Sequence, residues 1–501
     1  MAGRLSTFLT LSLLFFSNID ISESKYASST TKFNRRIPRR QYPIDDQYLY
    51  PPHSPSHYRN VMDSWSDSIR INPNDKVNFP LVRPTDFGAD PTGINDSTQA
   101  FQLCLRAALQ YNTSQHHLAF GVVDLGGVTM DLGGGDYLIS QPIVWPVNTG
   151  NFRMIDGTLR ASLSFPSDRW LIEVGNQSAC TNGQGSCNED AGFEGLFLDG
   201  NQVAAGGLRI SATMGANVGP QMFFLNFTTA GIQLDGGHEV MIHETWIGEF
   251  LYSDKRKENG TASTAIGILI NGNDHYVTNT IIFSSHVGVQ LTGAANMITG
   301  VHTWNLALSN SGTGIAVMAS QNRFDGIYLD FNDIIFYNTQ NQVVMDAFFL
   351  CGGHVVFHPT SNNQEFRGVT LLGNEFECVG QGQNNTIEVN TTSGSFGQIT
   401  DFTVVGTTAQ DGFTIRSPSV TKVVTINNPT TSWTVDFSDA LAFDTSIAPI
   451  VSVQYSFTLP SGTFTQHAAR PSGNSAVVTV ETSTPVSGTL TITVDQSYHS
   501  V

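Results

Sequence analysis

Acidic side chains and histidines gather in the stretch of chain between Asp235 and His275. Two carboxyl groups at a fixed separation can serve as the acid and base of a glycoside hydrolase, about 6.5–9.5 Å apart in inverting enzymes and about 5 Å apart in retaining ones. A carboxylate near a like charge has a raised pKa and can stay protonated as the acid. The pattern predicts that an acid–base pair is drawn from the following cluster: Asp235, Glu239 and Asp274, with His238 and His275 beside them.

A second group of carboxylates lies further along the chain and forms a rival prediction. Asp325 and Asp330 follow one another closely, and His302 and Trp304 precede them by about one repeat of the sequence. Asp199 occupies the equivalent place in an earlier segment. Since Asp and Asn are favoured at turns for backbone reasons alone, either group could also consist of solvated turn residues.

The elements that must position these residues are short strands that repeat between about Gly195 and Val405. One family of segments begins GLRIS, GIQLDG, GILING, GVQLTG and GIAVMA at Gly207, Gly231, Gly267, Gly288 and Gly314. The other begins GLFLDGN, GVHTWN, GIYLDFN, AFFLCGG and GVTLLGN at Gly195, Gly300, Gly326, Ala347 and Gly368. Strands of four to six alternating residues cannot bury their faces alone, so they indicate stacked coils.

The repeat therefore predicts an all-β fold built on a right-handed parallel β-helix. Equivalent residues of successive coils would lie about 4.8 Å apart. Alignment of Gly231, Gly267 and Gly288 then places the side chains of one set in a single outward column: Asp235, Asn271 and Thr292. In the next turn Glu239 falls opposite Asp274.

Both ends of the coil stack are expected to be covered. An amphipathic helix, capped at Asn95 or Asp96 and running through Ala107, would close the first coil. Alternating Thr-, Ser- and Val-rich segments from residue 409 to 501 indicate a small C-terminal β-sandwich-like domain. The β-helix itself is expected over residues 78–408.

The first 77 residues and the composition indicate an exported protein. Residues 1–22 are typical of a signal peptide, and residues 23–77 of a disordered leader or propeptide. The net charge of −18 argues against a nucleic-acid partner, and no segment after the signal is long and apolar enough for a membrane.

Glycosylation is expected at seven sequons: Asn95, Asn112, Asn176, Asn226, Asn259, Asn384 and Asn390. Disulfides are expected between Cys180 and Cys187 and between Cys351 and Cys378, with Cys104 left as a buried apolar side chain.

The opening DFGADPTG at Asp86, followed by DST and AF near Ser97, resembles the start of the pectin-lyase-like superfamily over residues 80–410. The whole chain resembles the plant QUARTET-type polygalacturonases, relatives of glycoside hydrolase family 28. That resemblance implies inverting hydrolysis of α-1,4-linked homogalacturonan, the demethylated pectin of the plant cell wall, by a secreted enzyme of the apoplast. The paired aspartates and Gly-His-Gly of family 28 are absent, and only Asn322 to Ile327 resembles its Asn-Thr-Asp-Gly-Ile element.

An acidic polysaccharide needs cations where it docks on an acidic protein. Between Lys76 and Lys422 the chain's lysines are Lys255 and Lys257, with Arg256 between them, in a long insertion between two coils. We expect these three residues, with Arg209, His238, His275 and His302, to bind substrate, and we expect a monomer that needs no cofactor or metal. Two alternatives stay open: a calcium-dependent pectate lyase with Arg209 as base, and a non-catalytic pectin-binding wall protein.

Overall fold

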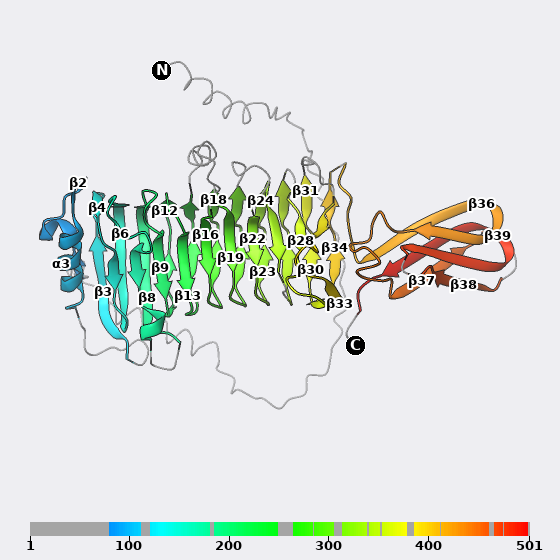
Figure 1. Ribbon diagram of the computed structural model, residues 1–501, viewed down its shortest axis with the longest axis horizontal. Coiled ribbons are helices and arrows are strands. Elements are labelled where there is room, and N and C mark those ends of the chain that lie inside the picture. Colours follow the sequence, from blue (N-terminus) through cyan, green and yellow to red (C-terminus); the bar gives the residue numbers. More distant parts are fainter. Residues whose placement is uncertain are drawn as a thin grey trace, which may run out of the picture. The chain divides into compact units, whose positions relative to one another are not determined.

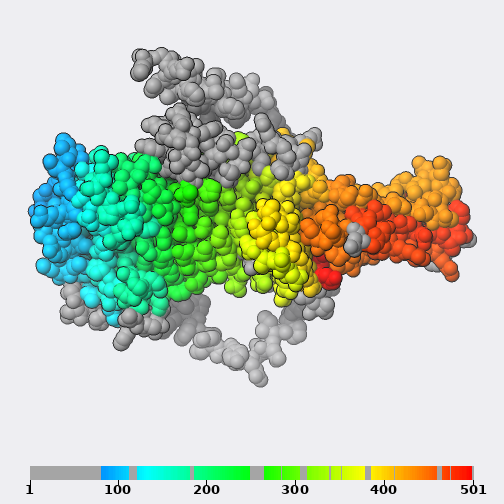
Figure 2. Space-filling view, in the orientation of Figure 1, coloured from blue at the N-terminus to red at the C-terminus, as the bar shows by residue number. Residues whose placement is uncertain are grey.

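The computed structural model describes residues 80–111, 121–180, 185–248, 264–283, 285–304, 313–337, 340–350, 353–377, 385–410, 412–459, 465–473 and 475–498. From the first of these ranges to about residue 409 the chain forms a right-handed parallel β-helix (Figure 1). In the space-filling view, successive coils form successive bands from cyan to yellow (Figure 2). The predicted signal peptide and leader lie outside the described residues.

Each central coil contributes three short strands, which we call legs 1, 2 and 3. Leg 1 belongs to a ten-stranded parallel sheet: β5 (Ile143–Trp145), β7 (Trp170–Val174), β9 (Gly206–Ser211), β13 (Ala230–Asp235), β16 (Ile266–Ile270), β19 (Val287–Leu291), β22 (Thr313–Val317), β25 (Asp333–Phe336), β28 (Val355–Phe357) and β32 (Ile387–Val389). Its pairings join Ile232 to Ile268 and Ile268 to Val289. The predicted alignment of the Gly231, Gly267 and Gly288 segments is confirmed.

Legs 2 and 3 belong to a second, larger sheet. Leg 2 consists of β14 (Met241–His243), β17 (Tyr276–Thr278), β20 (Met297–Thr299), β23 (Arg323–Asp325), β26 (Val343–Met345), β30 (Thr370–Leu372) and β34 (Thr403–Val405). Leg 3 consists of β12 (Met222–Leu225), β15 (Thr245–Ile247), β18 (Ile281–Phe283), β21 (His302–Trp304), β24 (Tyr328–Asp330), β27 (Phe348–Leu350), β31 (Glu375–Glu377) and β35 (Thr408–Ala409).

One residue with positive φ separates leg 2 from leg 3 in each of these coils. Glu244 has φ 49°, Asn279 φ 48° and Gly326 φ 57°. The left-handed conformation turns the chain sharply while both flanking strands keep their ladder hydrogen bonds, and Gly and Asn reach it at least cost. The glycines that open GVHTWN and GIYLDFN are therefore bend residues.

One segment was assigned to the wrong leg. The chain after Gly368 forms β30, which pairs with β26 and β34 in leg 2. The strand that continues leg 3 beyond β27 is β31, with Phe348 opposite Glu375. Both strands follow a positive-φ glycine, Gly368 or Gly373, so the sequence offered two similar starts.

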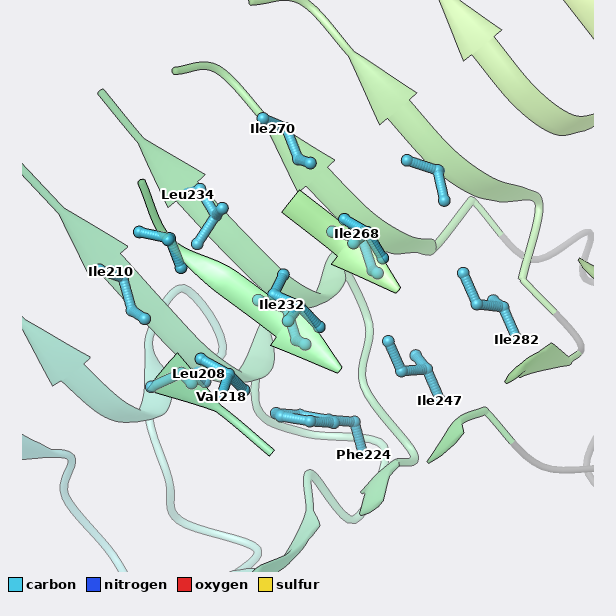
Figure 3. Close-up of a cluster of buried hydrophobic side chains, with 14 of the residues drawn as sticks. Leu208, Ile210, Val218, Phe224, Ile232, Leu234, Ile247, Ile268, Ile270 and Ile282 are labelled. Carbon is cyan, nitrogen blue, oxygen red and sulfur yellow. The ribbon is translucent and has the colours of Figure 1, made fainter. Parts of the chain in front are cut away.

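The interior of the coils is filled by stacked aliphatic and aromatic side chains. Figure 3 shows one portion, in which Leu208, Ile232 and Ile268 from leg 1 face Phe224 and Ile247 from leg 3. All five side chains are fully buried. Burial of one such side chain stabilises the fold by about 1.5–3 kcal/mol, so the repeat itself supplies the continuous core that no single coil has.

The first coils contain three long strands, β3 (Val123–Asp131), β6 (Thr149–Ala161) and β8 (Asn188–Asp199), together with the shorter β1 (Leu81–Val82), β2 (Thr92–Asp96), β4 (Asp136–Ile139), β10 (Thr213–Met214) and β11 (Asn217–Val218). Helix α3 (Thr98–Ala108) packs Phe101, Cys104 and Leu105 into the core. Its N-cap is Ser97, not the predicted Asn95 or Asp96, and the Asp96 carboxylate accepts a hydrogen bond from Thr98 N at 2.9 Å.

The last part of the chain forms a sandwich-like antiparallel domain from β36 (Ser419–Asp436), β37 (Ser452–Thr458), β38 (His467–Pro471) and β39 (Val477–Asp495). The two long strands β36 and β39 pair along most of their length, β37 pairs with the end of β39 and β38 with its beginning. Trp433, Val480 and Ile492 are buried in its separate core. A two-stranded sheet of β29 (Gln364–Arg367) and β33 (Phe396–Thr400) completes the described strands in the coil region.

Candidate active site

Asp235, at the end of leg 1, is held by three side chains. Arg209 Nε donates to Asp235 Oδ2 at 2.6 Å, and Asn271 Nδ2 donates to Oδ1 at 2.9 Å. Gln233 Nε2 reaches both oxygens at 2.8 and 3.0 Å. Thr292 Oγ1 in turn donates to Asn271, so the predicted outward column exists as a hydrogen-bonded chain. Both oxygens are engaged, which leaves this carboxylate poorly placed to exchange a proton with substrate.

The turn after leg 1 brings the other members of the first cluster together at the surface. Glu239 N donates to the backbone oxygen of Asp274 at 3.1 Å. His238 Nδ1 lies 3.4 Å from Asp274 Oδ2, and Asn273 Nδ2 donates to the same oxygen at 2.8 Å. The Asp274 side chain is 44% exposed, so water screens the charges of this cluster.

His275 does not belong to that surface, and its predicted contact with substrate is wrong. The residue is fully buried. Val240 N donates to His275 Nδ1 at 3.2 Å, and His275 N donates to Asn296 Oδ1 at 2.9 Å. Burial lowers the pKa of His275 to about 4, with the nearby His238 acting in the same direction. The imidazole is therefore a neutral part of the interior.

His275 is the first member of a ladder of polar side chains inside the coils. Asn296 N donates to Asn322 Oδ1 at 2.8 Å, and Asn322 N donates to Gln342 Oε1 at 3.2 Å. Asn322 and Gln342 are both fully buried. The Asn322 side chain, at the start of the element that resembles the family 28 motif, thus satisfies backbone groups at a turn and does not reach solvent.

The outer face of leg 3 carries a continuous row of rings, which we call the aromatic track. Ring centroids are 5.8 Å apart for Phe197 and Phe223, 6.4 Å for Phe223 and Trp246, and 4.9 Å for Trp246 and Phe283. The contacts continue to His302, Trp304, Tyr328 and Phe348. Figure 1 shows the strands of leg 3, among them β12, β18, β24 and β31, following one another along the stack.

Asp330 is the carboxylate on this face beside the track. It lies opposite Trp304 in the register of β21 and β24. Burial raises the pKa of Asp330 to about 6. Its Oδ1 atom is buried without a hydrogen-bond partner among the described residues. A carboxyl group in a largely apolar surrounding that holds its proton near neutral pH has the property required of a general acid.

His302 and Tyr328 form the other half of this local arrangement. Their rings stack with centroids 4.2 Å apart and planes 4° from parallel. Burial lowers the pKa of His302 and raises the pKa of Tyr328, the latter also through the nearby Asp330 charge. Both side chains are therefore neutral at pH 7 and flank Asp330 without supplying a counter-charge.

Two acidic residues on the same face were missed by the sequence analysis. The register of leg 3 runs from Asp330 to Leu350 to Glu377, and from Tyr328 through Phe348 to Glu375. Two coil steps put the backbone of Glu377 roughly 9.6 Å from that of Asp330. When GVTLLGN is assigned to leg 3, Glu375 and Glu377 are not recognised as residues of that leg. The alternation of acidic and apolar residues in NEFE after Gly373 is the pattern that predicts them.

The remaining carboxylates of the second group lie apart from Asp330. Asp325 is on the outer face of leg 2, across the Gly326 bend, between Thr299 and Met345 of the neighbouring coils. Asp199 accepts hydrogen bonds from Asn226 Nδ2 at 2.8 Å and Asn201 N at 2.8 Å. Asp199 therefore stabilises a turn near the first ring of the track.

Several predicted residues cannot be placed. Lys255, Arg256, Lys257, Cys351, Cys378, Asn112, Asn259 and Asn384 lie outside the described residues. The structure contains the Cys180–Cys187 disulfide, with a Cα–Cα distance of 5.6 Å. Among the other sequons, Asn95 and Asn226 use their amide nitrogens in hydrogen bonds, whereas Asn176 and Asn390 accept through Oδ1.

Two further features bear on ligands and location. Within the described part of the chain, no three His, Cys, Asp or Glu side chains lie close enough together to hold a metal ion. No helix in these ranges has the length and apolar character needed to span a bilayer. Arg209, considered above as the base of a lyase, is ion-paired with Asp235 and lies over the Trp170 ring at 5.1 Å.

The coil architecture and the register of its legs define a parallel β-helix protein of the pectin-lyase-like class. The chain is 34% identical over 419 residues to Polygalacturonase QRT3 of Arabidopsis thaliana, which covers 82% of this chain and 83% of that protein. The chain belongs to the family of that polygalacturonase, as the sequence resemblance predicted. No protein-family model matches the chain.

Solved structures match this chain at low sequence identity, and the first of them shows the same fold. ORF18 of Geobacillus virus E2 matches 88% of this chain and 81% of its own length, with a TM-score of 0.52 and 13% identity. A mutant tailspike protein of E. coli bacteriophage HK620, in complex with a hexasaccharide, matches 88% of this chain and all of its own, with a TM-score of 0.45 and 12% identity.

Proposed function

We propose that this protein is an inverting polygalacturonase that hydrolyses α-1,4-galacturonosyl linkages of demethylated homogalacturonan, with Asp330 as its general acid. The observation that carries the proposal is the raised pKa of a half-buried carboxyl group beside a row of rings. Membership in the polygalacturonase family supports a glycosidase that acts on pectin. The row of rings beside Asp330 offers an apolar surface on which the apolar faces of sugar rings can pack.

Asp330 would donate its proton to the glycosidic oxygen as the bond to the anomeric carbon breaks. The leaving sugar then departs as a neutral alcohol, and Asp330 is left ionised. Water attacks the anomeric carbon from the opposite face and gives its proton to a second carboxylate. We assign that base to Glu377, which follows Asp330 by two coils in the same outward column; their backbones are roughly 9.6 Å apart, slightly more than the about 6.5–9.5 Å that separates the two carboxyl groups of inverting enzymes.

The Asp235, Glu239 and Asp274 cluster is the less suitable site. A general acid must give its proton to substrate, whereas both oxygens of Asp235 are occupied by Arg209, Asn271 and Gln233. We therefore assign Asp235 to holding the coils together. Asp274 and Glu239 remain the alternative acid–base pair. The activity of Asp274→Asn, compared with that of Asp330→Asn, distinguishes the two assignments.

The biological setting proposed here follows from the family and the leader sequence. We propose a monomeric, secreted and glycosylated protein of the plant cell wall, with residues 1–22 removed as a signal peptide. Hydrolysis by two carboxylates needs no metal. Lys255, Arg256 and Lys257 would pair with uronate carboxylates of the substrate.

Product analysis on polygalacturonate tests the proposed reaction. Reducing ends and unsaturated-uronate absorbance are followed together, with and without a chelator. Hydrolysis gives new reducing ends without the absorbance, and the chelator leaves the rate unchanged. Absorbance that disappears with the chelator would establish a calcium-dependent lyase instead. Binding without either product would establish the non-catalytic wall protein.

A further inference from the structure

The aromatic track is not centred on Asp330. Five coils on the N-terminal side of Asp330 carry its rings, from Phe197 on β8 to Trp304 on β21. On the C-terminal side Phe348 is followed one coil later by Glu375, and leg 3 ends with β35. The surface available to a bound chain is therefore much longer on one side of the candidate acid than on the other.

The two sides also differ in charge. On the C-terminal side Glu375 and Glu377 occupy both outward positions of β31. On the N-terminal side the positions between Asp199 and Trp304 are filled by rings and aliphatic side chains. A polyuronate that extends past the base Glu377 would have its carboxylates repelled by Glu375 and Glu377, whereas on the other side its sugar rings can pack on the aromatic side chains.

From this asymmetry we infer that the aromatic track from Phe197 to Trp304 is the main binding surface for the galacturonan chain, with most of the bound chain on the N-terminal side of Asp330. This inference rests on the proposed function for the position of the cut and for the identity of the ligand. Phe197 and Phe223 are each 38% exposed, and because each ring stacks on its neighbour along the track, a ligand contacts their outward edges. One coil step is about 4.8 Å, close to the length of one pyranose unit, so an extended chain can contact successive rings.

The position of the rings makes the binding affinity depend on the length of the oligogalacturonide. An oligogalacturonide that reaches only His302 and Trp304 gains the contacts nearest Asp330. A longer one also contacts Trp246 and then Phe223. Affinity should therefore rise with chain length over several units and then level off once the chain extends past Phe197.

The experiment measures binding in the inactive Asp330→Asn protein, by calorimetry with oligogalacturonides of defined length. Phe223→Ala and Trp246→Ala in that background should each weaken binding of long oligomers about threefold to tenfold and leave short ones unchanged. Met241→Ala, in the coil of Trp246, and Tyr276→Ala, in the next coil, lie on the outer face of leg 2 and are controls because they are 50% and 37% exposed. Circular dichroism and thermal unfolding verify that each variant is folded.

The results distinguish a failure of the aromatic track as the binding surface from a failure of the proposed function. Equal affinity of Phe223→Ala and its parent for long oligomers, or an equal loss in Met241→Ala, overturns the track as the binding surface even if the wild type hydrolyses polygalacturonate. Full activity of Asp330→Asn would instead contradict the proposed acid. In that case the same length series is measured with reduced reaction time, and a loss confined to long oligomers in Phe223→Ala still supports the track.

Discussion

Asp330 lies directly opposite Trp304 in the pairing of β24 with β21, so a carboxyl group and an indole occupy adjacent steps of the same outer face. The Oδ1 atom of the carboxyl group is buried there and has no hydrogen-bond partner among the described residues. The raised pKa of Asp330 follows from that desolvation. Both the stability of the fold and its proposed chemistry should depend on this one group.

The first prediction concerns the stability of Asp330→Asn. The pKa of Asp330 is higher in the folded chain, about 6, than the ordinary value of 3.8, so folding favours the protonated form. Its contribution to stability is present below about pH 4 and is lost as the pH rises through 6. Asp330→Asn should therefore be more stable than wild type at pH 7 by about 1–2 kcal/mol, allowing for partial solvent exposure.

Denaturant unfolding at pH 4 and pH 7 checks this prediction. The gain should be present at pH 7 and absent at pH 4. Asp325→Asn removes a carboxylate from the same coil but on the outer face of leg 2, and is the matched control. A gain of equal size at both pH values would show that it arises from something other than the proton of Asp330.

The second prediction has the opposite sign and concerns His275. Its pKa is lowered to about 4 by burial, so the unfolded chain binds the proton more readily. The stability contributed by the neutral imidazole is present above about pH 6.5 and is lost as the pH falls towards 4, by about 2–3 kcal/mol. His275→Gln does not titrate and keeps an acceptor for Val240 N, so its stability should fall less over this range.

Thermal or denaturant unfolding between pH 7 and pH 4 measures the difference, with His243→Gln as a control at the outer face of leg 2. A wild type and a His275→Gln variant with parallel pH dependence would show that another group causes the acid instability.

The third prediction concerns the interior polar ladder. Asn322→Ala removes the acceptor of Asn296 N and the donor to Ala319 O, both inside the coils. The buried Asn296 N then has no partner, whereas Ala319 O keeps the hydrogen bond from Gln342 Nε2, so the loss should be about 1–3 kcal/mol of unfolding free energy. Asn273→Ala is the surface control, because its amide donates to the exposed Asp274. Equal losses in the two variants, measured in urea, would contradict a special role for the ladder.

The architecture could be predicted from sequence because its signal is repeated. Ile232, Ile268 and Val289 each face inward at the same place in successive segments, and the structure pairs them in that register. An error in the assignment of a single segment therefore does not change the predicted fold. The C-terminal domain could likewise be predicted from an alternation that β37 keeps throughout and β36 keeps over most of its length.

The site could not be predicted in the same way, because it depends on what surrounds each outward side chain. Asp235 and Asp330 both end a strand with an outward carboxylate. One meets Arg209 and Asn271, and the other meets Trp304. These partners come from different coils. If one segment is assigned to the wrong leg, as the segment after Gly368 was, its residues are given the wrong neighbours. His275 shows the same limit, since a histidine at a turn can face either solvent or the core.

The fourth prediction tests whether the Asp235 carboxylate stabilises the fold and takes no part in the reaction. Asp235→Asn leaves the Arg209 guanidinium without its counter-charge and should lower stability by about 1–2 kcal/mol. Arg209→Lys should lose a similar amount because it gives up the short Nε contact and the position over the Trp170 ring. Chemical denaturation of the two single variants and the double variant gives their coupling. Strictly additive losses would contradict a direct interaction.

The most direct test of the account compares initial rates of reducing-end release from polygalacturonate by folded Asp330→Asn, Asp235→Asn and Asp274→Asn proteins. Loss of the general acid should lower turnover by at least about a hundredfold in Asp330→Asn, while Asp235→Asn and Asp274→Asn remain within a few-fold of wild type. The opposite outcome, near-normal turnover in Asp330→Asn with a hundredfold loss in Asp235→Asn or Asp274→Asn, would contradict the assignment and move the chemistry to the end of leg 1.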